Sequence, residues 1–104
     1  MLKIIQMLSN KIEESIESAE EYMEAAIEYK NDYPDVAKAL FNVSESEMTI
    51  MSLLHSTVAK VISDYRKTNG EPPAPMMAVY EYLHKKHIDG AARVKAMQQM
   101  FKES

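Results

Sequence analysis

Two short breaks divide this sequence into three segments that have the periodicity of helices. Asn31-Asp32-Tyr33-Pro34 combines turn-forming residues with a proline that suits the first turn of a helix. Asn69-Gly70 followed by the proline-rich residues 71–75 is typical of a helix end and an extended connector. We therefore expect an all-α chain with three long helices.

The predicted helices cover about residues 2–30, 34–67 and 76–102, and together they form one domain over residues 1–104. Apolar residues recur in each segment at alternating steps of three and four, which is the spacing of an inward helical stripe. The third stripe stays in phase across Gly90, which favours one helix there over two. The expected inward positions are Ile5, Leu8, Ile12, Ser15, Ala19, Tyr22, Ala26 and Tyr29, then Leu40, Val43, Glu47, Ile50, Leu54, Thr57 and Val61, then Met76, Tyr80, Leu83, His87, Gly90, Val94, Met97 and Phe101.

Short connectors predict that neighbouring helices run antiparallel in a bundle. Composition fits such a domain, because 104 residues with 46% hydrophobic content can bury one core. The formal net charge of −4 argues against nucleic-acid binding. The chain has no cysteine, which excludes disulfides and is compatible with the cytoplasm that we expect. We interpret the N-terminus as helix rather than a signal peptide, and no apolar run reaches the roughly 20 residues that cross a bilayer.

Glu47 is the one charged residue in its predicted stripe, and a buried carboxylate must find a cation, a donor or a proton. Three interpretations stay open at this point. Glu47 binds a metal ion, or it forms an ion pair with Lys95 or Arg93 that fixes helix register, or it is protonated. A protonated carboxyl group would form hydrogen bonds with Ser15, Ser44 or Tyr22.

The first two segments resemble the first helical hairpin of rubrerythrin-type proteins in the ferritin-like superfamily, across roughly residues 12–55. The residues that carry the resemblance are Ala19, Tyr22 and Ala26, then Tyr33 in the turn, followed by Glu47. The resemblance implies a ferritin-like bundle in which Glu47 is a ligand of iron or manganese. The chain departs from the family pattern twice, with Ile50 at the expected histidine position and Ser15 at the expected first-helix glutamate position.

The chain has three predicted helices where a complete ferritin-like bundle has four. We therefore expect a homodimer to complete the bundle, an arrangement similar to that of short encapsulin-associated ferritins.

The three histidines form a second candidate metal site. His84 and His87 are three residues apart on the third segment, and the antiparallel arrangement brings His55 level with His87. Three imidazoles could bind zinc or another divalent ion. The alternative is that His87 is a hydrogen-bonded core residue with His55 and His84 beside it. Glu81 and His84 also have Glu-x-x-His spacing, but their level is roughly 20 Å from that of Glu47.

Two classes of function follow from the sequence. The first is a non-enzymatic interaction or structural protein, with a degenerate metal site and a protein partner that the sequence does not identify. The alternative is an iron- or manganese-binding oxidoreductase whose site is assembled across a homodimer. We expect the first, because Ile50 and Ser15 remove donor atoms while the scaffold can persist.

Overall fold

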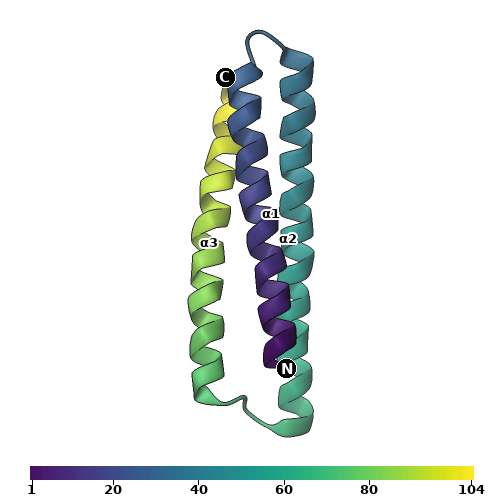
Figure 1. Ribbon diagram of the computed structural model, residues 1–104, viewed down its shortest axis with the longest axis vertical. Helices are drawn as coiled ribbons and strands as arrows, with labels where there is room; N and C mark the ends of the chain where they lie inside the picture. The colour runs from purple at the N-terminus through teal and green to yellow at the C-terminus, as the bar shows by residue number, and fades with distance from the viewer.

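Three helices and no strand make up the computed structural model of this protein, which describes residues 1–104 (Figure 1). The helices are α1 (Leu2–Tyr29), α2 (Pro34–Asn69) and α3 (Ala74–Glu103). The prediction of an all-α chain with three long helices is confirmed, and each predicted bound lies within two residues of the observed one. Figure 1 shows that successive helices run in opposite directions. The molecule is a rod of 56 × 19 × 17 Å.

The helix ends follow from local chemistry. Pro34 opens α2, and Asp35 lies in its first turn, where a negative charge is favoured by the helix dipole. Arg66 and Lys67 lie in the last turn of α2, where positive charge is favoured. Gly70 then ends the helix with φ at 76°, a conformation that side chains other than glycine rarely adopt.

Helix α1 is the central element of the fold. It packs along both other helices, whereas the backbones of α2 and α3 come close at only a few places and are bridged there by side chains. One apolar cluster joins Ile12, Met48, Val58 and Val94, and a second lies near the α1–α2 turn. In the second cluster the rings of Phe41 and Phe101 stack with their centroids 4.9 Å apart.

The predicted inward face of α2 is wrong by one residue. The buried residues are Ala37, Phe41, Ser44, Met48, Val58 and Ile62, and all but Ala37 lie one position after a predicted one. Because one residue turns a helix by about 100°, the stripe that contains Glu47 faces sideways instead of inward. In α1 the same shift affects Tyr22 and Tyr29, which are exposed, while Met23 is buried.

The predicted inward face of α3 is confirmed at His87, Gly90, Val94 and Phe101, which are buried. Helix α3 continues through Gly90, as the phase of its stripe predicted. A Cβ atom at this position would lie only 2.9 Å from Cγ2 of Ile16, so the missing side chain lets α3 approach α1 closely. None of the three helices combines enough length with enough apolar residues to span a membrane.

Candidate functional site

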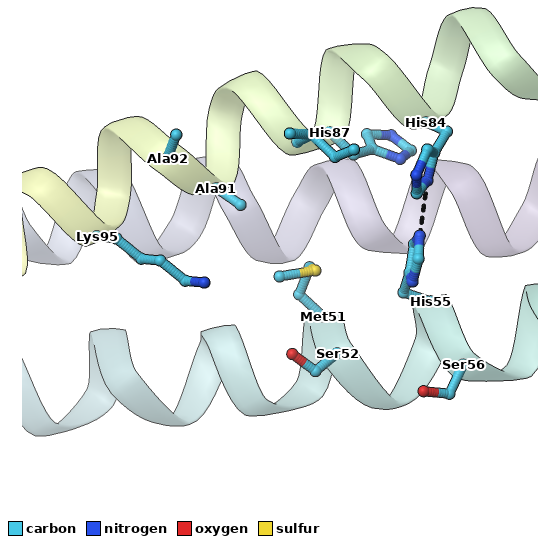
Figure 2. A pocket seen from close by; sticks show the side chains of 10 residues that line it. Met51, Ser52, His55, Ser56, His84, His87, Ala91, Ala92 and Lys95 are labelled. Atoms are coloured by element: carbon cyan, nitrogen blue, oxygen red, sulfur yellow. Dashed lines mark hydrogen bonds between the residues drawn. The ribbon is translucent and has the colours of Figure 1, made fainter.

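A cleft of about 550 Å³ lies between α2 and α3 (Figure 2). It exists because the two helices meet at only a few places. Toward the α1–α2 turn, Gln98 Nε2 donates a hydrogen bond of 3.1 Å to Ser44 Oγ. Further along, His55 of α2 meets His84 of α3. The cleft lies alongside this histidine pair, with Met51 and Ala91 among its lining residues.

His55 and His84 are joined by one short hydrogen bond between α2 and α3. His55 Nε2 and His84 Nδ1 are 2.7 Å apart, so one nitrogen must carry the shared proton and the other must offer a lone pair (Figure 2). Partial burial and the neighbouring His84 lower the pKa of His55 below its ordinary value. The contact therefore requires at least one neutral imidazole, and protonation of both rings would replace attraction by repulsion.

His87 lies in the wall of the cleft rather than in the pair. Its side chain is only 5% exposed, and its Nε2 has no hydrogen-bond partner. Burial lowers the pKa of His87, and the nearby carboxylate of Glu13 partly opposes this effect. The predicted approach of His55 to His87 is wrong by one helical turn, because His84 takes that place.

The three histidines of the predicted zinc site therefore line one cleft, but only His55 and His84 bring their nitrogens together. No group of three or more His, Asp or Glu side chains is arranged to hold a metal ion. Glu81 is exposed, and no hydrogen bond joins it to His84. Binding of a divalent ion by His55, His84 and His87 stays a prediction.

Glu47, the predicted iron or manganese ligand, is half-buried on the side of α2. Ser15 is buried, while Ile50, at the family's histidine position, is 45% exposed. One carboxylate beside a serine and an isoleucine supplies too few donor atoms for a dinuclear centre. These residues do not fit the di-metal site that the ferritin-like resemblance implies.

The predicted ion pair of Glu47 does not form. Arg93 lies 4.0 Å from Glu20 of α1, and Lys95 extends into the cleft between α2 and α3 (Figure 2). No Lys, Arg or His nitrogen lies within 4.0 Å of the Glu47 carboxylate. A role for Lys95 or Arg93 in fixing helix register through Glu47 is therefore wrong.

Ser44 has one of the three roles considered for Glu47, that of a buried polar residue that fixes helix register. It is fully buried, its Oγ donates a hydrogen bond of 2.9 Å to the carbonyl oxygen of Ala19, and it accepts the hydrogen bond from Gln98. Ser44 thus joins all three helices at one level. In the sequence, Ser44 is a small polar residue in a stripe of α2 that lies one residue away from the stripe of Glu47. The stripe of Glu47 is the more apolar of the two, so apolar periodicity alone places it inward.

Glu47 instead lies within an apolar surface that we call the open face. Helices α1 and α2 pack together through their buried stripes. On both helices, a residue one position after a buried one, such as Glu13 or Ser52, points toward α3 or the cleft beside it. A residue one position before a buried one therefore points away from α3. Seven large apolar side chains on that side are between 36% and 51% exposed. The open face consists of these seven, Ile4, Met7, Tyr22, Tyr29, Val36, Val43 and Ile50, with half-buried Leu40, Glu47, Leu54 and Val61.

Comparisons of this chain with protein-family models, with curated proteins and with solved structures found no match.

Proposed function

We propose that this protein is a non-enzymatic interaction protein, which binds another helical protein surface through its open face. One observation carries the proposal: a stripe of α2 from Val36 to Val61, apolar except at Glu47 and Thr57, lies beside α1 without a third helix against it. The ferritin-like ancestry expected from Tyr33 and Glu47 stays a prediction, and the proposed function does not depend on it.

The physical support comes from helix α2, which has two adjacent apolar stripes. The first stripe, which includes Phe41 and Met48, is buried against the rest of the molecule. The second stripe, which includes Val43 and Ile50, has the same heptad spacing and stays at the surface. Scattered exposed apolar residues are ordinary, but apolar side chains gathered along one stripe of a helix are typical of an interaction site. Burial of such surface contributes about 25 cal/mol per Å².

The alternative function, an iron- or manganese-dependent oxidoreductase, has less support from the residues. Glu47 has no imidazole one turn along the helix, and the three histidines lie around a cleft on the other side of α2. The oxidoreductase alternative therefore stays a prediction.

Site-directed photocrosslinking tests the proposed function. A benzophenone amino acid replaces Val43 on the open face, and in a matched variant it replaces Val79, an exposed valine of α3 outside that face. Both variants are expressed at the level of the native protein and irradiated in living cells. We expect defined covalent adducts from position 43 and none of comparable yield from position 79.

Two results would overturn the proposal. One is the absence of an adduct at position 43, and the other is an equal yield from positions 43 and 79. The mass of the adduct separates two kinds of occupant, because a second copy of the chain adds 11.9 kDa and another protein adds a different mass.

A further inference from the structure

We infer that the first part of α3, residues 74–86, is an arm that detaches from α2 and unfolds while the rest of the molecule stays folded. The hydrogen bond between His55 and His84 holds this arm closed. His84 also lines one end of the cleft between α2 and α3, so opening of the arm widens the cleft at that end. The inference goes beyond the proposed function and does not involve the open face.

Burial divides α3 into two unlike parts. Its buried residues all lie after the arm, and they are His87, Gly90, Val94 and Phe101. Within the arm, Tyr80 alone packs against an apolar cluster of the core, and its side chain is only partly buried. A segment with few buried apolar contacts opens at a lower free-energy cost than the core beside it. The arm is therefore the part of α3 that opens first.

The rest of α3 is anchored to both other helices. Val94 is fully buried in the main apolar cluster. Gln98 donates its hydrogen bond to Ser44 of α2. The ring of Phe101 stacks on that of Phe41, also of α2. These contacts do not involve the arm, so they persist when the arm opens.

Two polar contacts join the side chains of the arm to the other helices. Lys86 pairs with Glu13 of α1 at 2.7 Å, but 53% of the Lys86 side chain is exposed, and such a surface pair contributes little to stability. The other contact is the partly buried hydrogen bond of 2.7 Å between His55 and His84 (Figure 2). The ring of His84 also stacks on that of Tyr80, with centroids 5.7 Å apart. One imidazole thus supports both the polar and the apolar contact of the arm.

The arm is bounded on both sides by residues that form helix poorly. Before it lies the connector with Gly70 and Pro72, which is not helical. After it comes Gly90, and glycine is the weakest helix former apart from proline. Isolated helices shorter than about 12–15 residues are only marginally stable in water, and the arm is no longer than this. An arm that leaves α2 therefore loses its helix, and its backbone amide protons become free to exchange.

Amide hydrogen exchange of the native chain tests whether the arm opens as a unit. Rates are measured residue by residue at about pH 7.5, where an ordinary imidazole is mostly neutral, and are corrected for the intrinsic rate of each amide. We expect the amides of residues 78–86 to exchange at least about tenfold faster than those of residues 90–98. Equal protection along both stretches would overturn the arm.

Replacement of His55 tests the contact that closes the arm, and it leaves the sequence of the arm itself unaltered. His55→Ala removes the hydrogen bond to His84, so we expect exchange in residues 78–86 to become about fivefold faster, with no change in residues 90–98. His55→Gln places an amide group where the imidazole Nε2 was, and it should restore most of the native protection. Gln98→Ala is the matched control, because it removes the other hydrogen bond between α2 and α3. It should leave exchange in residues 78–86 unchanged.

Three results with these variants would overturn the inference. If His55→Ala leaves exchange in residues 78–86 at the native rate, the histidine bond does not close the arm. If His55→Ala accelerates both stretches equally, α3 unfolds as one element and there is no separate arm. If Gln98→Ala accelerates residues 78–86 as much as His55→Ala does, any loss of contact between α2 and α3 has the same effect, and His55 has no special role.

Discussion

The histidines of the cleft make the stability of this protein depend on pH. Burial lowers the pKa of His55 and His87 in the folded chain, whereas the unfolded chain has the ordinary value of 6.5. Below that value the unfolded state binds more protons than the folded state, so stability falls as pH decreases. The loss begins as pH drops through 6.5 and is complete below the lowered folded-state pKa. We expect urea denaturation to show a lower free energy of unfolding at about pH 5 than at about pH 7.5.

The control for this prediction removes the two titrating groups. A variant with His55→Gln and His87→Gln should lose less stability over the same pH interval. Glu13, Lys86 and His84 surround these groups and remain in the variant, so the comparison isolates the two imidazoles. If the variant loses as much stability as the native chain, other groups cause the pH dependence.

Glu47 gives the second prediction for a single residue. Because one carboxylate beside Ser15 and Ile50 supplies too few donors, we expect purified, tag-free protein to bind well below one iron or manganese ion per two chains. Bound metal and oxygen consumption are measured after incubation with ferrous iron or manganese, for the native chain and for Glu47→Ala. Stoichiometric binding that Glu47→Ala abolishes would contradict this expectation and restore the oxidoreductase alternative.

The helices themselves show how far sequence reasoning reaches. The three long elements and their ends were predictable because Pro34, Gly70 and the prolines after it limit where a helix can continue. The inward face of α3 was also predictable, because only one apolar stripe runs through His87 and Val94.

The inward face of α2 was not predictable for a physical reason. Two stripes with the same spacing run along this helix, one residue apart. The stripe that packs inward contains Ser44 and His55, while the stripe that stays at the surface contains Val43, Ile50 and Leu54. Apolar periodicity alone favours the second stripe. Hydrogen bonds to the other helices determine which stripe packs inward. Ser44 bonds to the carbonyl of Ala19, and His55 bonds to the imidazole of His84.

Gly90 gives a prediction at the level of helix packing. Replacement of Gly90 by alanine should raise the helix propensity of α3 by about 1 kcal/mol. The new Cβ would lie 2.9 Å from Cγ2 of the branched side chain of Ile16, and overpacking of this kind costs roughly 1–3 kcal/mol. We expect Gly90→Ala to lower the free energy of unfolding by about 1 kcal/mol in urea denaturation.

In the Ile16→Ala background, Gly90→Ala should raise the free energy of unfolding instead of lowering it. Without Cγ2 of Ile16 the added methyl group has room, so Gly90→Ala should then stabilise the protein by up to about 1 kcal/mol. A Gly90→Ala variant that is more stable than the native chain in both backgrounds would show that the contact with Ile16 does not limit the approach of α3 to α1.

The molecule as a whole is a rod with one central helix, so its two outer helices depend on α1 more than on each other. Helix α3 covers one side of the α1–α2 hairpin, while the other side is the open face. A chain of 104 residues has a limited core, and pairing of the open faces would add to the buried apolar surface. The stability of such a molecule should therefore depend on association.

Thermal unfolding at several protein concentrations tests this dependence. If unfolding is coupled to dissociation of a dimer, the melting temperature should rise by about 3 °C for each tenfold increase in concentration. Ile50→Lys should abolish the rise, because it places a charge in the open face. It should leave the stability of the monomer almost unchanged, since Ile50 is exposed in the single chain. Val79→Lys, the same gain of charge on α3, should keep the concentration dependence. A melting temperature of the native chain that is independent of concentration would contradict the coupling.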